Sequence, residues 1–381
     1  MKINRTLFIY AVPFLFLSCG NNKTAAVKEE GDTLVFKHAR NICIVKLADR
    51  TEVTIYDPWE KGNILHAYTL IGNRQSTDSK STKVHATTGD VVKIPLTHSL
   101  VTTSVHCELL KMLGKEHCIS GVCDLQYFTS TWVKEMNKKG DIADCGNSMA
   151  PNIEQIIQLS PDAIFLSPMQ NSGGYGKIAN IGIPIIEVAD YMEGTPLGRA
   201  EWVKFYGLLF GCEKKAEKMF EETEKQYAEL KQKAKQANVS PLVLMDKVEN
   251  GTWFLPGGKS TIAQMIRDAN ISYAYSDDSS AGSIQKAKES VVETNAQADL
   301  WLMRYYKPEG TLSLKELASQ DKSYQLIKAF KNGNIYGCNT ATSRFFEETP
   351  FRPDMLLRDF IIIAHPEVKG LGKAQYFSKL K

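Results

Sequence analysis

The sequence of 381 residues lacks the marks of several common protein classes. It has no basic surplus, since 46 Lys and Arg stand against 43 Asp and Glu, and this balance argues against wholesale binding of nucleic acid. Only seven histidines occur, without an HxxxH or HxH pair, and the cysteines form no CxxC pair. These absences argue against a bare metal ion and against structural zinc, so we expect no metal site and no resident cofactor.

Local motifs of common enzymes are also missing. There is no GxSxG elbow, no HExxH helix and no Ser/His/Asp or Cys/His arrangement signalled by a motif. Residues 257–261 (GGKST) look like the end of a phosphate-binding loop, but that loop needs a glycine five residues before Gly258, where Trp253 stands. We therefore expect no enzymatic activity, although a glycine-rich turn at a helix start can still hold an anionic group.

The first eighteen residues have the features of an export signal. A short basic start precedes the apolar run of residues 7–17, which is too short to span a bilayer and contains Pro13. Ser18-Cys19-Gly20 is similar to the cleavage box of bacterial lipoproteins, in which the cysteine becomes the lipid-bearing N-terminus, although Phe16 departs from that pattern. We expect residues 1–18 to be removed and Cys19 to be lipidated, with ordinary secretory cleavage as the alternative.

The rest of the chain predicts a protein that is anchored to a membrane and does not span it. No other stretch approaches eighteen consecutive apolar residues, and residues 19–32 are polar and unpatterned, as expected of a flexible tether. Loss of Lys2 and Arg5 with the signal lowers the net charge from +3 to +1. The expected location is the periplasm or cell envelope, and the choice between inner and outer membrane stays open.

Seven cysteines remain after Cys19, an odd number that cannot pair completely within one chain. We expect most of them to be small buried hydrophobic residues, with one disulfide among Cys118, Cys123 and Cys145 as an open alternative. The seven are Cys43, Cys107, Cys118, Cys123, Cys145, Cys212 and Cys338.

The length and a hydrophobic fraction of 43% suit two or three globular domains. Residues 33–88 read as a small β extension and a polar linker, whereas residues 89–212 and 239–381 alternate strands with helices. Such alternation predicts parallel βα units. We predict an α/β fold: two Rossmann-like lobes with parallel sheets joined by one long helix, plus a small N-terminal β extension.

The predicted connecting helix covers residues 213–238, which are strong helix formers with a thin apolar stripe. At ~1.5 Å per residue it would be roughly 40 Å long, about the height of a domain. We interpret it as a rod between two lobes, with a long surface helix inside one domain as the alternative. Two lobes on one rod favour a ligand cleft between them.

The two halves of the sequence contain a weak internal repeat. Glu154 stands eight residues before Asp162, and Glu289 stands ten residues before Asp299. In each case an amphipathic helix ends in a short turn, and an Asp then opens an apolar strand. This pattern indicates duplicated α/β lobes.

Residues 89–381 resemble the periplasmic binding proteins that deliver ferric siderophores, haem and vitamin B12 to ABC importers. The resemblance rests on the order and spacing of segments such as VVKIPLTHSLVTTSVHCELLKMLGKEHCISGVCD, PNIEQIIQLSPDAIFLSP, GIPIIEVADYMEGTPLGRAEWVKFYGLLFG and FRPDMLLRDFIIIAHPEV. The segment YDPWEKGNILHAYTL also resembles the N-terminal extension of one lipoprotein branch of this family.

The resemblance implies partners and docking residues. In this family one acidic residue at the tip of each lobe meets arginines of the two permease subunits. Glu154 is the matching position in the first lobe, and Glu289 is the expected one in the second, with Glu293 as a rival. The implied partners are an ABC permease dimer with its ATPase subunits and a chelate of iron or cobalt, and we expect a monomer.

Ligand-binding candidates lie in the loops that we expect at the carboxyl ends of the strands, where open α/β sheets bind ligands. Aromatic and cationic side chains there suit a large, partly apolar chelate with anionic edges. For each aromatic residue, packing in a lobe core is the alternative, and for His98 an axial bond to a chelated metal competes with a simple hydrogen-bonding role. The candidates are His98, Tyr127, Tyr191, Trp253, Arg304, Tyr305 and Arg344.

Glu193, Arg199 and Glu201 form a polar group that we interpret as a structural hydrogen-bond network. The predicted function is a lipid-anchored substrate-binding protein that captures a ferric siderophore or a cobalamin and hands it to a permease. Two alternatives stay open: haem as the ligand, and a chelate-binding sensor or storage lipoprotein that works without a permease.

Overall fold

The computed structural model describes residues 31–72, 89–170 and 174–381. These ranges do not include the expected export signal, Cys19, nearly all of the expected tether, or the linker that follows the β extension. Within the described ranges, no helix is both long and apolar enough to cross a membrane.

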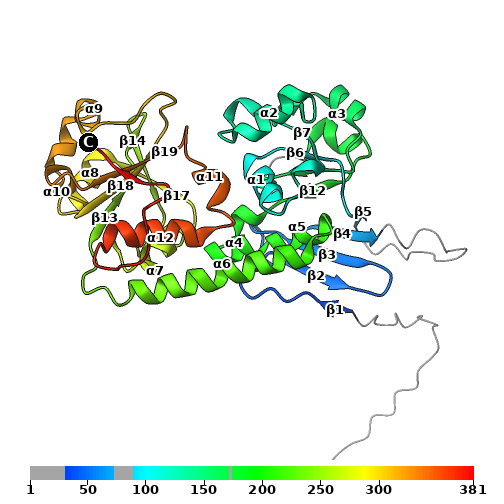
Figure 1. Ribbon diagram of the computed structural model, residues 1–381, viewed down its shortest axis with the longest axis horizontal. Helices are drawn as coiled ribbons and strands as arrows, with labels where there is room; N and C mark the ends of the chain where they lie inside the picture. Colours follow the sequence, from blue (N-terminus) through cyan, green and yellow to red (C-terminus); the bar gives the residue numbers. More distant parts are fainter. Residues whose placement is uncertain (1–30, 73–88, 171–173) are drawn as a thin grey trace, which may run out of the picture.

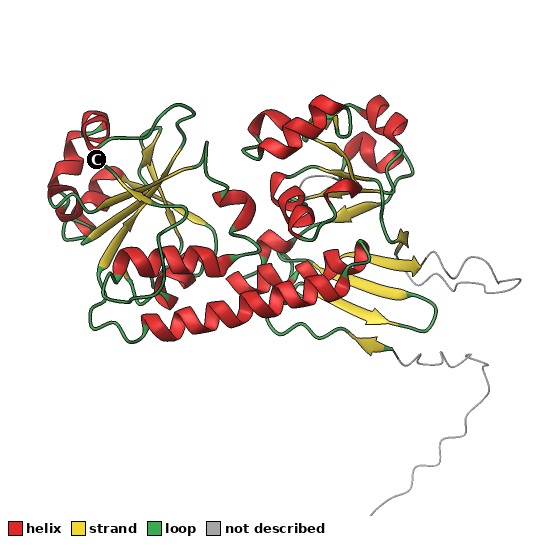
Figure 2. Cartoon of the chain, viewed as in Figure 1, coloured by secondary structure: helices red, strands yellow, loops and turns green. Residues whose placement is uncertain are grey.

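Two α/β lobes stand side by side above one long helix (Figure 1, Figure 2). This helix, α6 (Glu213–Ala234), runs beneath both lobes, and a small β sheet from the N-terminal residues lies against the first lobe. The predicted α/β fold with two lobes, one connecting helix and a β extension is confirmed.

Helix α6 joins the lobes because its buried stripe belongs to two different cores. Ala216 and Phe220 pack in the core of the first lobe, whereas Tyr227, Leu230 and Ala234 pack in the core of the second. Residues at a spacing of three, four or seven share one helix face, so a single stripe can serve both lobes. The helix ends at Ala234, earlier than the expected residue 238.

The β extension is one five-stranded sheet in which only the last pair of strands is parallel. Its strands follow the order of the chain and are β1 (Asp32–Thr33), β2 (Ile42–Lys46), β3 (Thr51–Tyr56), β4 (Ile64–Gly72) and β5 (Asp90–Ile94).

The extension shares its core with the first lobe. Alternate residues of β2 and β3, such as Ile44 and Val53, are fully buried in the same cluster as the first-lobe residues Leu109 and Phe205. We expected the first lobe to begin at residue 89, but β5, at the start of that range, pairs with β4 and belongs to the extension instead.

Two buried carboxylates fix the extension to the first lobe. Glu201 accepts the backbone N–H groups of residues 37–39 at 2.7–3.0 Å, and Glu193 accepts those of residues 40 and 41 at 3.0 Å. Trp202 Nε1 also donates to Glu193 at 2.9 Å. The structure thus places Glu193 and Glu201 in a structural hydrogen-bond network, as expected.

The first lobe is built on a parallel sheet in the order β12-β11-β6-β7-β8. Its strands are β6 (Ser99–Val101), β7 (Ile119–Val122), β8 (Ala143–Asp144), β11 (Ala163–Leu166) and β12 (Ile185–Glu187), with a separate hairpin of β9 (Gly146–Asn147) and β10 (Ala150–Pro151). Its helices are α1 (Ser104–Met112), α2 (Thr131–Lys139), α3 (Ile153–Leu159), α4 (Pro196–Glu201) and α5 (Val203–Leu209).

The second lobe repeats the plan with the sheet order β16-β13-β18-β19-β20, in which only β20 is antiparallel. Its strands are β13 (Leu242–Met245), β16 (Ser272–Tyr273), β18 (Leu300–Tyr305), β19 (Ile335–Asn339) and β20 (Ser378–Lys379), and a side sheet holds β14 (Val248–Glu249), β15 (Thr252–Pro256) and β17 (Ser283–Ala287). Its helices are α7 (Thr261–Asp268), α8 (Lys288–Thr294), α9 (Leu314–Gln320), α10 (Lys328–Lys331), α11 (Phe345–Glu348) and α12 (Pro353–Ala364).

The seven described cysteines are all free thiols, and five of them are buried. The disulfide that was left open among Cys118, Cys123 and Cys145 is not formed in the structure. Burial raises the pKa of Cys123 to about 12 and that of Cys145 to about 11, so these thiols are protonated at neutral pH. They act as small hydrophobic residues, as expected.

Candidate functional site

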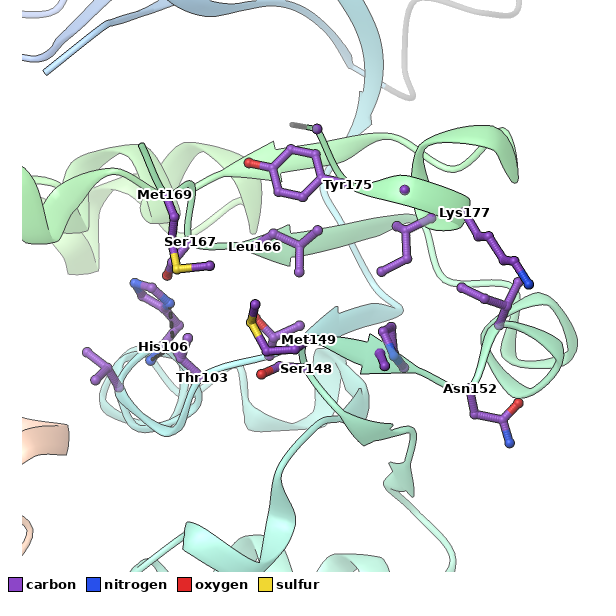
Figure 3. A pocket seen from close by; sticks show the side chains of 18 of the residues that line it. Thr103, His106, Ser148, Met149, Asn152, Leu166, Ser167, Met169, Tyr175 and Lys177 are labelled. Atoms are coloured by element: carbon purple, nitrogen blue, oxygen red, sulfur yellow. Dashed lines mark hydrogen bonds between the residues drawn. The ribbon is translucent and has the colours of Figure 1, made fainter. Parts of the chain in front are cut away.

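A cavity of 1160 Å³, which we call the first-lobe cavity, lies in the first lobe. It opens at the carboxyl edge of the first-lobe sheet, the edge at which α/β sheets bind ligands (Figure 3). The lining comprises residues 102, 103, 105 and 106 after β6, residues 148–154 at the β9–β10 hairpin, residues 166, 167 and 169 after β11, and residues 174–178, 190, 191 and 199.

The walls of this cavity combine apolar and hydroxyl groups. Figure 3 shows Met149 and Met169 among the side chains that line the cavity. Ser148 and Ser167 lie beside them. Thioether side chains adapt to irregular apolar ligands, so this wall suits a large ligand with an apolar body.

A second cavity of 230 Å³, the interlobe cavity, lies between the lobes. Its first-lobe side consists of Val105, Pro196 and Arg199. Its second-lobe side consists of Thr261, Ile262, Met265, Arg304, Phe345, Phe346, Thr349, Pro350 and Pro353. The two cavities share Val105 and Arg199, so they adjoin at these side chains and together form the candidate binding cleft.

Asp190 organises the place where the two cavities meet. It is fully buried, and its Oδ1 lies 2.9 Å from His106 Nε2 while its Oδ2 accepts Arg199 Nε at 2.9 Å. Thr103 Oγ1 lies 2.6 Å from the other ring nitrogen of His106. Burial acts to raise the pKa of Asp190, but His106 and Arg199 outweigh it and lower that pKa below its ordinary value. The carboxylate is therefore charged and holds Arg199 in place.

Arg304 is held in the same way on the second-lobe side. Its Nε and Nη2 donate to the two carboxylate oxygens of Asp246 at 2.9 and 2.6 Å. Its guanidinium carbon lies 5.9 Å from the ring centre of Phe345 and 6.0 Å from that of Phe346. Burial opposes the charge, but Asp246 raises the pKa of Arg304, so the guanidinium stays charged.

The structure places two of the predicted ligand residues, Tyr191 and Arg304, in the lining of the cavities. The hydroxyl of Tyr191 donates to the carbonyl of Pro168, which fixes the ring at the rim of the first-lobe cavity. Tyr127 is 75% exposed in the turn after β7 and lines neither cavity.

The expectation that Trp253 and Tyr305 face the cleft is wrong. Trp253 is fully buried in the second-lobe core, where its Nε1 donates to the Met245 carbonyl at 2.9 Å, and Tyr305 is only 6% exposed. Successive strand residues point to opposite faces, so the exposed aromatic rings at these places are the next residues, Phe254 and Tyr306.

The expectation that His98 lines the cleft is also wrong. It precedes β6, and its backbone N–H donates to Asp162 Oδ2 at 2.9 Å, just before β11. His98 therefore lies at the amino edge of the sheet, opposite the cavities. The reason is that β5 belongs to the extension, so the first strand of the lobe is β6, and its carboxyl end comes at Thr102 and not at His98.

Arg344 ties the two lobes together. From the N-cap position of α11 it donates to Glu108 Oε1 of α1 at 3.0 Å, and it lies 2.8 Å from Glu348. Glu108 is buried, and its other oxygen accepts Ser130 Oγ and Trp132 Nε1, each at 3.0 Å. Arg344 lines neither cavity, so the structure gives it an interlobe contact where the sequence predicted ligand binding.

Replacing Arg344 by Met is expected to lower the free energy of unfolding by about 1–2 kcal/mol, because buried Glu108 loses its cationic partner but keeps two hydrogen bonds. Urea unfolding of the purified chain measures this change. Lys218→Met, which removes an exposed pair on α6 at 3.9 Å, is the control and should change stability by less than about 0.5 kcal/mol. Unchanged stability with lost ligand affinity would return Arg344 to the ligand site.

Sequence reasoning missed His106 and Met149 and gave Arg199 only a structural role. Met149 lies in the β9–β10 hairpin, which has no recognisable strand pattern. His106 lies in the first turn of α1, and it was missed because β5 was counted as part of the first lobe. The position of Asp190 just after β12 was the available signal, since a buried Asp there needs a cation and Arg199 follows it nine residues later.

The two predicted docking glutamates occupy equivalent places. Glu154 is the second residue of α3 and Glu289 is the second residue of α8, and both are exposed. Asp162 accepts the N–H of His98 at 2.9 Å and Asp299 accepts that of Leu242 at 2.9 Å, so each Asp fixes the start of a neighbouring strand.

The spacing from the glutamate to the following aspartate differs between the lobes because the connection after the helix differs in length. Both helices have seven residues, and the longer connection in the second lobe is residues 295–298, against residues 160–161 in the first. Glu289 therefore matches Glu154 by position, whereas Glu293 lies in the last turn of α8.

The architecture defines a class of protein. Two α/β lobes on one connecting helix, with cavities at the carboxyl edge of a sheet and between the lobes, form a two-lobed solute-binding protein. A family model described as periplasmic binding protein matches residues 101–342, and the chain belongs to this family. The family and the fold are those of binding proteins and not of enzymes.

Curated relatives share nearly the whole chain. An uncharacterized lipoprotein of Methanocaldococcus jannaschii is 27% identical, over 93% of this chain and 87% of its own length. A second uncharacterized lipoprotein of the same organism is 24% identical, over 86% of this chain and 85% of its own.

Solved structures share the fold at low sequence identity. The TroA-like periplasmic binding protein FepB of Veillonella parvula is 16% identical with a TM-score of 0.58, covering 76% of this chain and 96% of its own. A periplasmic heme binding protein of Pseudomonas aeruginosa is 15% identical with a TM-score of 0.58, covering 75% and 98%. The periplasmic vitamin B12 binding protein BtuF of Vibrio cholerae is 13% identical with a TM-score of 0.54, covering 72% and 99%.

Proposed function

We propose that this protein is the substrate-binding lipoprotein of an ABC importer, which captures a ferric siderophore or a cobalamin between its lobes and delivers it to a permease. In this proposal the chain is anchored in the cell envelope through lipid on Cys19, acts as a monomer and catalyses no reaction. The ligand brings the metal with it. The described residues contain no group of three His, Cys, Asp or Glu side chains able to hold a metal ion, which supports capture of a chelate over capture of a free ion.

The observation that carries the proposal is the pair of adjoining cavities. A cavity of 1160 Å³ is larger than the ~300–1,000 Å³ typical of sites for drug-sized ligands, and it adjoins a cavity between the lobes. Its lining presents thioethers, aromatic rings and the cation Arg199. A bulky chelate with an apolar body and a polar edge fits this combination.

Binding is expected to need little rearrangement. The lobes already contact each other through Arg344 and Glu108, and through Thr129, whose N–H and hydroxyl both donate to Glu347. Each lobe also packs its own core on the same helix, α6. A cleft that is preformed loses less conformational entropy when it binds a ligand.

Calorimetric titration of the mature chain with cobalamin, haem and a panel of ferric siderophores tests the proposal. We expect one chelate of the panel to bind saturably, in a one-to-one ratio. Trp253 is a poor fluorescent reporter because it is buried in the core, so calorimetry is the better readout. Absence of binding by every member of the panel would contradict the proposal, and binding of haem alone would select that alternative ligand.

A blocking variant localises the bound ligand. Val105 lines both cavities, so Val105→Trp is expected to fill their junction and to lower affinity at least tenfold. Val239→Trp, at an exposed residue outside both cavities, is the matched control and should bind as the wild type does. Equal affinity of the two variants would place the ligand elsewhere.

A further inference from the structure

The interlobe cavity has an unusual lining. Its twelve lining residues include two arginines, Arg199 and Arg304, and no carboxylate. The other ten are apolar residues and threonines. Two like charges facing a small cavity repel each other, and apolar walls strengthen that repulsion because they keep the local dielectric low. Such an arrangement is stable only if each cation is compensated from behind or if an anion occupies the space between them.

Compensation from behind is present on both sides. Asp190 binds Arg199 through Nε at 2.9 Å, and Asp246 binds Arg304 through Nε at 2.9 Å and Nη2 at 2.6 Å. Both carboxylates are buried, and Asp190 is also bound to His106 at 2.9 Å. These contacts fix the two guanidinium groups without reaching their outer edges.

The outer edges keep unused donors. Within the described part of the chain, the two Nη atoms of Arg199 make no hydrogen bond, and the Nη1 atom of Arg304 makes none either. Arg199 and Arg304 have 25% and 32% of their side chains exposed, although both line a cavity with mostly apolar walls. Fixed guanidinium groups with free N–H donors are built to bind a carboxylate or a phosphate.

Helix geometry adds to the positive potential. Thr261 and Ile262 are the first residues of α7, and Pro353 is the first residue of α12, and all three line the interlobe cavity. The amino ends of helices carry partial positive charge and favour anions. The arginines and the helix ends therefore act in the same direction.

We infer that the interlobe cavity is a subsite for one compact anionic group, a carboxylate or a phosphate, that Arg199 and Arg304 bind together from the two sides of the cleft. The inference rests on the proposed function in one respect: it says that the captured chelate carries such a group, while its apolar body lies in the first-lobe cavity. The anion then bridges the lobes, so a chelate with a free acidic arm is preferred to one without it.

Small anions test the subsite directly. Citrate and inorganic phosphate are titrated separately into the mature chain at low ionic strength. We expect at least one of the two anions to raise the melting temperature saturably. A response to citrate alone identifies a carboxylate subsite, and a response to phosphate alone identifies a phosphate subsite. The absence of a saturable response to both anions would overturn the inference.

Variants assign the response to the two arginines. Arg199→Gln and Arg304→Gln are each expected to weaken anion binding at least about tenfold, since each removes charge-assisted hydrogen bonds. Arg199→Lys and Arg304→Lys keep the charge and should recover part of the affinity, and they replace the Gln variants if those fail to fold. Undiminished anion binding in both Gln variants, or in both Lys variants where those replace them, would overturn the inference.

Arg352 supplies a matched control. It is held by the buried carboxylate of Asp354 through Nε at 2.9 Å and Nη2 at 2.7 Å, with 31% of its side chain exposed, yet it lines neither cavity. Arg352→Gln should leave anion binding unchanged. If the chain binds citrate or phosphate but no chelate of the panel, the subsite stands and the proposed ligand class is wrong. If a chelate binds but no anion does, the proposed function stands and the subsite is wrong.

Discussion

A chain that carries both Glu154→Arg and Glu289→Arg is expected to bind its ligand and yet to support no uptake. This expectation rests on the proposed role in delivery to a permease. Each glutamate is exposed at the second position of a short helix, one in each lobe, and Glu289 has 80% of its side chain exposed. If arginines of two permease subunits meet these carboxylates, reversal of both charges turns two attractions into two repulsions.

The fold should survive these changes. A glutamate in the first turn of a helix stabilises it by about 0.3–1 kcal/mol through the helix dipole, so the two reversals cost little compared with the stability of a domain. Glu289 lines neither cavity, so Glu289→Arg alone should keep wild-type affinity. Glu154 lines the first-lobe cavity but is exposed to solvent, so its reversal is expected to change affinity only slightly.

Uptake of the labelled chelate by cells that express each variant measures the effect, next to calorimetric affinity of the purified chains. Glu293→Arg, which reverses an exposed charge in the last turn of α8, is the control and should transport normally. Normal uptake by the double variant would rule out docking through these residues. Uptake by the wild type that does not depend on any permease would favour the sensor or storage alternative.

The fold could be predicted from the sequence because its signals are local and periodic. The stripe on residues 213–238 needs only the spacing of Phe220, Tyr227 and Leu230 to be recognised. What the spacing could not show is that this stripe changes from one core to the other along the helix. The boundary of the first lobe failed for a similar reason: β5 looks like the first strand of a βα unit, and only its pairing with β4 assigns it to the extension.

The candidate site was predicted less completely, because a shift of one residue decides whether a strand residue faces the cleft or the core. Trp253 and Tyr305 were chosen for their chemistry, but their neighbours Phe254 and Tyr306 are the exposed residues. Arg199 shows a different limit. Its partner Asp190 is close in sequence, but the second cation of the interlobe cavity, Arg304, comes from the other lobe. No local sequence pattern predicts that two residues so far apart in the sequence line the same cavity.

The largest expected loss of stability follows from replacing Glu201 by Gln. Glu201 is fully buried and accepts the N–H groups of Lys37 and Ala39 at 3.0 Å and that of His38 at 2.7 Å, together with Lys204 Nζ at 2.7 Å. A glutamine of the same shape keeps one acceptor and turns an NH₂ group toward backbone donors. Because each buried donor left without an acceptor costs about 1–3 kcal/mol, the free energy of unfolding should fall by about 3 kcal/mol or more.

Urea unfolding at neutral pH measures this loss, and Glu213→Gln is the matched control. Glu213 is half exposed and lies 3.4 Å from Lys46, an ion pair between α6 and the extension that is open to solvent. The control should lose less than about 0.5 kcal/mol. Equal losses in the two variants would mean that the backbone donors of residues 37–39 find other acceptors, and that the buried carboxylate does not fix the extension.

The dependence on pH separates the charge of Glu201 from its shape. Burial acts to raise the pKa of Glu201, but Lys204 and the three backbone donors outweigh it and lower that pKa below its ordinary value of about 4.3. A carboxylate with a lowered folded pKa stabilises the fold fully above the ordinary pKa, and this contribution is lost as the pH falls through the lowered value. The difference in stability between wild type and Glu201→Gln should therefore be complete at pH 7 and begin to shrink below the ordinary pKa. It should be smallest below the lowered pKa of the folded protein, where the wild-type side chain is also neutral. A difference that stays constant over this range would show that packing, and not the charge, fixes the extension to the lobe.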